Sequence, residues 1–164
     1  MAKTVVEMID PRDQGAGPLD LKKPVFDPNA VARANEAIKA MAGEFQAWLE
    51  RDVTRVQDAR LAAEASAWSN ATLETLLIAA HDLKGLGGSY DYPIVTQIAA
   101  SLCRLIETDP GKTAARAEPS LVAAHVDALR AAARGQIRTD AHPIGRALLQ
   151  ALEARVAALG VAPR

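Results

Sequence analysis

Residues 71–90 read ATLETLLIAAHDLKGLGGSY, with apolar side chains recurring every three or four positions. This spacing is typical of an amphipathic α-helix, which we expect over about residues 71–89. At about 100° per residue, His81 lies away from the apolar face of that helix and should point into solvent. The apolar face consists of Leu76, Ala79, Ala80, Leu83, Leu86 and Tyr90.

The composition of the 164-residue chain favours helix throughout. Hydrophobic residues make up 49% and aromatic residues only 4%, while alanine and leucine dominate and β-branched residues are thinly spread. This length supports one domain with a core of ordinary size. We therefore predict an all-α fold, with an antiparallel bundle over residues 27–135 and a further C-terminal helix within 136–164 that docks on it.

The N-terminal region is predicted to divide into an arm and a long helical stretch. Prolines and glycines interrupt residues 1–26, which we predict to be a mobile arm. Asp27 and Pro28 form a helix-start signal, and helical periodicity then runs to about Ala65, with Gly43 as a candidate break between two helices. The apolar stripe of this stretch, which we expect to face a core, is Val31, Ile38, Met41, Phe45, Trp48, Leu49, Val53 and Val56.

Turn signals divide the rest of the chain. We expect helices over about residues 93–108 and 119–133, separated by a loop over 112–118. A last helix should follow Pro143, with leucines at helical spacing that would pack on the bundle.

Three glycines follow His81 within the expected helix, although each should cost about 0.5–1 kcal/mol relative to alanine. Positions four and seven after a helical residue lie on its own side, so Gly85 and Gly88 should leave a clearing around His81. Lys84, three positions on, places a positive charge beside the imidazole. Gly87 lies toward the core face, where we expect it to allow close helix packing. Loops of a second protein could therefore reach His81.

Leu77 and Ile78 flank the direction of His81 on the preceding turn, which predicts an apolar docking rim. An exposed apolar patch beside a charged centre is typical of a transient protein interface.

An exposed histidine is largely neutral near neutral pH, so a ring nitrogen can attack phosphorus without a dedicated base. Phosphoryl transfer depends mainly on positioning and charge stabilisation, which a partner carrying Mg²⁺ could supply together with Lys84.

The segment HDLKG at residues 81–85, followed by Gly88, resembles the motif of the histidine-phosphotransfer domain family. In that motif a lysine and two glycines follow the histidine by three, four and seven positions. Residues 102–107, LCRLIE, are similar to the Leu-Cys-x-x-Leu-Glu run that commonly ends the family's next helix, with one position altered. The resemblance covers about residues 30–133, and HDLKGLGGSYDYP is also similar to small stand-alone members from alphaproteobacteria.

This resemblance implies an antiparallel four-helix bundle in which His81 is phosphorylated at its solvent-facing ring nitrogen. The partners would be response-regulator receiver domains, which hold Mg²⁺ and a phosphorylated aspartate, and a sensor or hybrid histidine kinase. Family members neither bind ATP nor autophosphorylate, so we expect a carrier without a cofactor of its own. Separately, we expect the chain to be a monomer. The family often has another glycine ten positions after the histidine; this chain has Asp91 there, so we expect the chain to turn differently.

Other polar residues have simpler explanations. Gln97 and Ser101 could orient the imidazole from the next helix, although packing also explains them. His125 and His142 are predicted to be structural, because no Glu-x-x-His or His-x-x-x-His pair brings two metal ligands together. Cys103 is the only cysteine, so no internal disulfide can form, and we expect it to be packed.

Charge and hydropathy exclude some classes of partner. The 19 basic and 20 acidic residues include no basic run that could follow a phosphate backbone, so we expect no nucleic-acid partner. The sequence shows no signal-peptide pattern and no apolar run of about 18 residues, from which we expect a cytoplasmic protein without membrane contact.

Two other functions stay open at this point. A non-enzymatic scaffold would bind a receiver domain without carrying phosphate. Alternatively, the chain is a detached phospho-accepting domain of a chemotaxis-type kinase, which would take phosphate from an ATP-bound kinase core.

Overall fold

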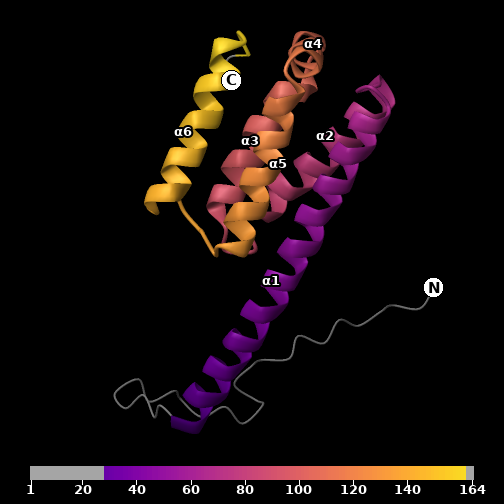
Figure 1. Cartoon of the computed structure of the whole chain (residues 1–164). Coiled ribbons are helices and arrows are strands. Elements are labelled where there is room, and N and C mark those ends of the chain that lie inside the picture. Colours follow the sequence, from indigo (N-terminus) through magenta and orange to yellow (C-terminus); the bar gives the residue numbers. More distant parts are fainter. Residues whose placement is uncertain (1–27, 162–164) are drawn as a thin grey trace, which may run out of the picture. The chain divides into compact units, whose positions relative to one another are not determined.

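The computed structural model of the chain describes residues 28–161, which contain only α-helices as regular structure (Figure 1). The predicted all-α fold class is therefore confirmed for this part of the chain. The predicted arm, residues 1–26, lies outside the described residues. None of the described helices combines the length and the apolar character needed to cross a bilayer. The helices are α1 (Pro28–Ala65), α2 (Asn70–Leu86), α3 (Pro93–Glu107), α4 (Asp109–Ala117), α5 (Pro119–Arg134) and α6 (Pro143–Ala158).

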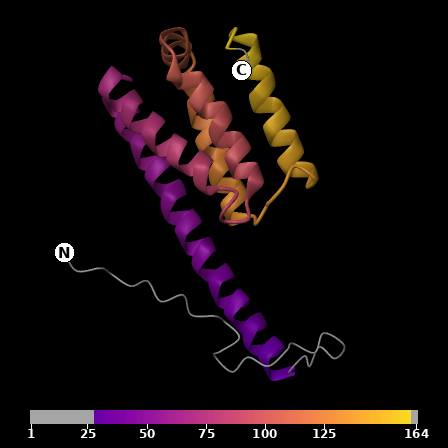
Figure 2. The same cartoon turned by 180° about the vertical axis from the view of Figure 1, so that it is seen from behind.

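The chain divides into two units, Met1–Ile38 and Lys39–Arg164. The second unit contains the hydrophobic core, and α3 packs there against α2, α4, α5 and α6 (Figures 1 and 2). Apart from the polar Ser101, every buried residue of α3 is apolar, which explains its contacts with four other helices. The largest fully buried side chains of the core are Tyr92, Leu49, Leu73, Leu76, Leu83, Ile94, Ile98, Leu102, Leu105, Ile106, Leu129 and His125.

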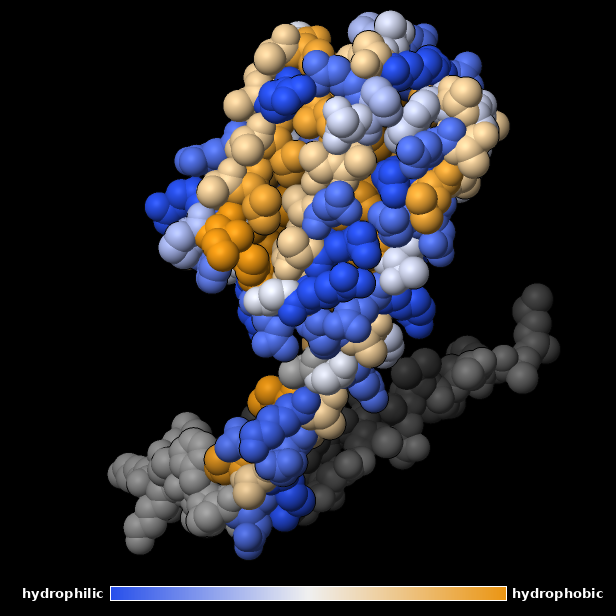
Figure 3. All heavy atoms as spheres, viewed as in Figure 1, coloured by the Kyte–Doolittle hydropathy of each residue, from blue (hydrophilic) through white to orange (hydrophobic). Residues whose placement is uncertain are grey.

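The expectation that the whole apolar stripe of α1 faces a core is wrong for its first part. Leu49, Val53 and Val56 are buried in the core, but earlier members of the stripe are exposed. Figure 3 shows apolar side chains standing among polar ones along the first part of α1. Periodicity identifies which face of a helix is apolar, but only the presence of another element decides whether that face is covered. The exposed members are Val31, Ile38, Met41 and Trp48.

Helix α1 is also continuous, so the candidate break at Gly43 is wrong. A side chain added at Gly43 would meet nothing within 4 Å, so no close packing or turn requires a glycine there. A single glycine weakens a helix by about 1 kcal/mol, which good helix formers on both sides can offset.

The loop predicted over residues 112–118 is likewise wrong, because the structure has helix α4 there. The backbone N–H of Gly111 donates to the hydroxyl of Thr108 at 3.2 Å, which caps the helix. Pro110 falls in the first turn, where its missing N–H has no helical partner to lose. The Asp-Pro-Gly sequence that was interpreted as a turn therefore starts a short helix.

Helix α6 packs against α3 and α5. A side chain added at Gly145 would come within 2.6 Å of the Cδ1 atom of Ile94, so glycine permits this close approach. Arg104 of α3 donates to both carboxylate oxygens of Glu153. The backbone N–H of Ile94 donates to the carbonyl of Arg138 at 3.0 Å, which ties the loop before α6 to the start of α3.

Candidate functional site

His81 lies on α2 with its side chain exposed, as the helical periodicity predicted. The opposite face of α2 is buried against the core through residues that include Leu76 and Leu83. Leu86, which we placed on the same face, is 37% exposed because it lies in the last turn of the helix. Within the described part of the chain, His81 makes no side-chain hydrogen bond, so both ring nitrogens can meet a partner.

The three glycines after His81 differ in their surroundings. A Cβ atom added at Gly85 or Gly88 would meet nothing within 4 Å, and both residues are exposed. A Cβ added at Gly87 would lie 2.6 Å from the hydroxyl oxygen and 2.8 Å from the backbone nitrogen of Thr96. Gly85 and Gly88 therefore leave open space beside His81, whereas Gly87 allows the end of α2 to approach the start of α3. Helical spacing predicted both the open space at Gly85 and Gly88 and the close helix packing at Gly87, and this geometry agrees with it.

We expect Gly87→Ala to lower the free energy of unfolding by about 1–3 kcal/mol, because overpacking against backbone atoms forces the structure to shift. Gly88→Ala is the matched control, since the added methyl group would enter open space. Urea denaturation of both variants checks this difference. Equal stability of the two variants would contradict the close contact between Gly87 and Thr96.

A surface hollow of about 280 Å³ lies beside His81, between α2 and α3. It brings together His81, Lys84 and both residues of the predicted apolar rim, Leu77 and Ile78. Of the rim residues, Ile78 is exposed and Leu77 is partly buried. Gly85, Gly88 and Gln97 do not line this hollow. The complete lining is Glu74, Leu77, Ile78, His81, Asp82, Lys84, Cys103 and Glu107.

Lys84 is the only basic residue that lines the hollow, where three carboxylates accompany it. Two of these carboxylates have cationic partners outside the lining. Asp82 accepts from Arg55 at 2.9 Å, and Glu74 lies 3.8 Å from the Nζ atom of Lys112. Within the residues that the structure describes, Lys84 forms no ion pair, so its ammonium group can bind an incoming anion.

Cys103 and Glu107 come to the hollow from α3, and single-helix spacing could not place them beside His81. Burial raises the pKa of the Cys103 thiol to about 11, although the nearby Lys84 ammonium opposes this shift. The thiol is therefore protonated near neutral pH and is no competing nucleophile. Its prediction as a packed residue is confirmed.

Ser101 does not orient His81, because its side chain is buried in the core and its hydroxyl lies 3.1 Å from Nε2 of His125. The other ring nitrogen of His125, Nδ1, lies 2.8 Å from the carbonyl oxygen of Leu121. His125 is thus a structural residue with both nitrogens satisfied. Gln97 is exposed and makes no side-chain hydrogen bond in the described region, so its role toward His81 stays a prediction.

Burial lowers the pKa of His125, while its hydrogen bond to the Leu121 carbonyl partly opposes the shift. Because the folded state then binds a proton less readily than the unfolded state, stability falls as the pH drops below about 6.5. We expect a loss of up to about 1.4 kcal/mol per pH unit below that value. Urea unfolding between pH 7.5 and 5.5 measures it. His142→Gln, at an exposed histidine, should retain this slope and His125→Gln should lose it; equal slopes would contradict the assignment.

His142 is structural too, since its Nδ1 accepts from the backbone N–H of Ile144 at 3.3 Å and caps α6. Within the described residues, no group of three or more His, Cys, Asp and Glu side chains could hold a metal ion.

The turn after α2 contains Asp91 at a φ of 63°. This left-handed conformation favours glycine, and aspartate is among the few other residues that tolerate it. The backbone here therefore has a conformation that a glycine would also favour, and the expected difference in the turn stays a prediction. The Asp91 carboxylate also accepts from Arg138, whose guanidinium lies 5.2 Å from the ring centroid of Tyr92.

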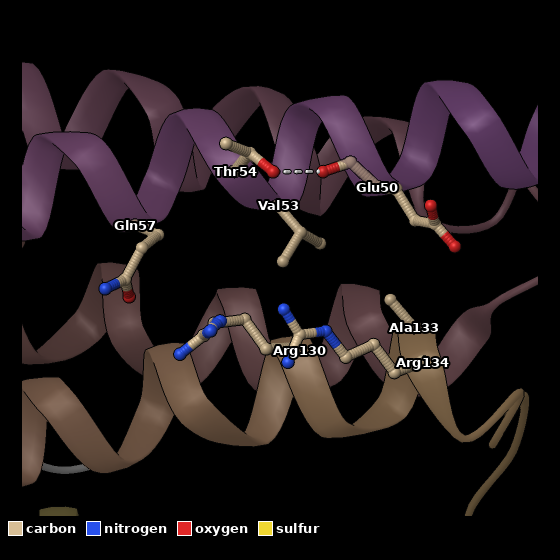
Figure 4. A pocket seen from close by; sticks show the side chains of 7 residues that line it. All are labelled: Glu50, Val53, Thr54, Gln57, Arg130, Ala133 and Arg134. Atoms are coloured by element: carbon tan, nitrogen blue, oxygen red, sulfur yellow. Dashed lines mark hydrogen bonds between the residues drawn. The ribbon is translucent and has the colours of Figure 1, made fainter.

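Two further hollows lie along α1. One of about 420 Å³ lies between α1 and α2, and Ile78 lines both this hollow and the one beside His81. The other, of about 280 Å³, lies between α1 and α5, where Gln57 and Val53 lie opposite Arg130 and Arg134 (Figure 4). None of the predicted site residues lines this α1–α5 hollow. Ile78 is therefore the residue that the hollow beside His81 shares with the hollow between α1 and α2.

Comparisons of this chain with protein-family models, with curated proteins and with solved structures found no match.

Proposed function

We propose that this chain is a histidine-phosphotransfer protein, a phosphorelay carrier that receives a phosphoryl group on His81 and passes it to an aspartate of a receiver domain. The observation that carries the proposal is the surroundings of His81. An exposed imidazole lies in a hollow with Lys84, which forms no ion pair among the described residues, and Gly85 and Gly88 leave open space beside it. Nothing in this arrangement provides a closed active site, which suits a group that must enter a partner's active site.

The proposed chemistry needs little from this chain beyond the nucleophile. A ring nitrogen of His81 attacks the phosphorus of a receiver aspartyl phosphate, so an N–P bond forms and the O–P bond to the aspartate breaks. The carboxylate leaves with the bonding electron pair, and the reverse reaction regenerates the aspartyl phosphate. Lys84 stabilises the charge of the phosphoryl oxygens, and the receiver supplies Mg²⁺. The chain is thus a carrier without ATP binding or autokinase activity.

The fold that belongs to this proposal is a four-helix bundle made of α1, α2, α3 and α5, with α6 as an additional helix. Ile78 and Leu77 would contact the receiver beside His81, since both line the hollow around it. A sensor or hybrid histidine kinase would supply the phosphoryl group through its receiver. We place this relay in the cytoplasm, where such kinases present their receiver domains.

The test is to incubate the full chain with receiver domains that carry radiolabelled aspartyl phosphate. We expect label on this chain that is stable in base and labile in acid, as a phosphoramidate is, and that maps to the peptide containing His81. Label that is labile in base, or that maps to another residue, would contradict the proposal. Failure of every donor in a broad panel, together with retained receiver binding, would favour the scaffold.

A further inference from the structure

We propose that the hollow between α1 and α5 binds a small molecule that carries a phosphate group. This α1–α5 hollow measures about 280 Å³ and lies wholly within the unit Lys39–Arg164 (Figure 4). It shares no lining residue with the hollow beside His81, so the proposal does not depend on phosphotransfer. Arg130 and Arg134 bind the phosphate oxygens, and Gln57 accepts a hydrogen bond from the ligand.

Two arginines supply the positive charge of the hollow. Arg130 and Arg134 are four positions apart on α5 and therefore lie on one side of it. Figure 4 shows both side chains extending from α5 into the space that faces α1. Like charges at this spacing destabilise a helix, and an anion bound between them removes that repulsion. A guanidinium group also presents paired N–H donors, which match the oxygens of phosphate.

The charges of these arginines are only partly used within the chain. Among the described residues Arg134 forms no ion pair, and Arg130 forms one, with the exposed Asp127 at 3.3 Å. A surface pair of this kind stabilises little, so an incoming anion can replace it. The carboxylate of Glu50 also lines the hollow, but it accepts from Gln46 at 2.6 Å and pairs with neither arginine. The hollow therefore keeps an excess of positive charge.

A buried acceptor indicates which anion fits. The side-chain oxygen Oε1 of Gln57 is buried and accepts no hydrogen bond from the described residues. Such an acceptor is unfavourable, and a bound ligand with a donor group supplies the missing partner. Near neutral pH inorganic phosphate carries an O–H group besides its anionic oxygens, whereas sulfate carries none. A phosphate ligand can therefore satisfy Gln57 and both arginines at once.

The walls of the hollow are held together without a ligand. The side-chain amide of Gln46, on α1, donates to the backbone carbonyl of Ala133, on α5, at 3.1 Å. Gln46 is itself fixed, because its Oε1 accepts from the hydroxyl of Tyr92 at 2.6 Å. The buried Val53 and Ala133 add apolar lining. A volume of about 280 Å³ is small for a ligand site, which fits a phosphate with at most a few carbon atoms.

Helix electrostatics alone does not explain the two arginines. A basic residue in the last turn, such as Arg134, interacts favourably with the dipole of α5. Arg130 lies one turn earlier, where this effect has faded, and its side chain also extends into the hollow (Figure 4). A nucleic acid fits less well, because the sequence contains no basic run. A small anion is therefore the ligand that the geometry favours.

Titration of the full chain with inorganic phosphate, at constant ionic strength, tests the site. We expect saturable shifts of the backbone amide resonances around Gln57, Arg130 and Arg134 at millimolar phosphate or below. Sulfate should bind about tenfold more weakly, because it cannot donate to Gln57. A titration with glycerol phosphate identifies the source of the phosphate group. Tighter binding than inorganic phosphate indicates a phosphate ester, and weaker binding indicates free phosphate.

Substitutions in the hollow test the role of each side chain. Arg130→Gln and Arg134→Gln should each weaken phosphate binding by about tenfold or more, since each removes a charge-assisted hydrogen bond. Arg51→Gln is the matched control, because it removes the same charge from an exposed position of α1 outside the hollow, and it should bind phosphate like the wild type. Gln57→Leu should fold at least as stably as the wild type and bind phosphate and sulfate equally.

Three results would each overturn the proposal: no saturable binding of phosphate, equal affinity of the wild type for phosphate and sulfate, or undiminished binding in both arginine variants. Loss of phosphate binding in Lys84→Gln, with shifts confined to the surroundings of His81, would place the anion in the other hollow and overturn it as well. Uptake of label on His81 is a separate measurement, so this proposal and the proposed function fail independently.

Discussion

The His81→Gln variant is expected to take up no phosphoryl label from a receiver that labels the wild type. Glutamine has no ring nitrogen that can attack phosphorus, and no other described side chain takes the place of His81 in the hollow. Folding should be unaffected, because the side chain of His81 is exposed and makes no hydrogen bond within the described residues. The measurement is the fraction of chain labelled after incubation with the phosphorylated donor.

His142→Gln is the matched control, because His142 is also exposed but lies at the start of α6. It should accept label at the wild-type rate. The same pair of variants separates the carrier from the scaffold, since a scaffold would give the same signalling output with or without His81. A chemotaxis-type accepting domain would instead take label directly from an ATP-bound kinase core, so an assay with such a core distinguishes the third possibility.

Gly85→Leu is expected to slow transfer to and from His81 by about 100-fold or more, because the branched side chain would occupy the space that a receiver must enter. Misplacement of reacting groups by about 1 Å can cost this much in rate. The variant should fold at least as well as the wild type, since leucine favours helix by up to about 1 kcal/mol over glycine and the added Cβ meets nothing within 4 Å. Transfer kinetics and thermal unfolding, measured on the same sample, test both parts.

Gly43→Leu provides the control for helix propensity. Gly43 is also an interior residue of a helix with open space around it, but it lies on α1. Its substitution should raise stability in the same way and leave transfer unchanged. Wild-type transfer rates in Gly85→Leu would refute the role of the clearing, whereas equal losses in both variants would point to a general effect of the substitution.

The relative positions of side chains on a single helix could be predicted from the sequence. His81, Lys84, Leu77 and Ile78 share one hollow because residues three and four positions apart lie on one side of a helix. The contributions of Glu107 and Cys103 could not be predicted, because they depend on how α3 packs on α2. The partner of Ser101 could not be predicted either, because it also depends on helix packing. Its hydroxyl faces the buried His125 on α5 and not His81.

Local sequence patterns predict the helical class, the helix starts at Pro93, Pro119 and Pro143, and the outward direction of His81. These features follow from local backbone preferences and from helical periodicity, which depend only on neighbouring residues. Tertiary structure alone decided which apolar faces are covered. Met41 and Leu49 belong to the same apolar stripe of α1, yet only Leu49 is buried. Burial depends on contacts between segments distant in the sequence, and the repeat within one helix does not contain that information.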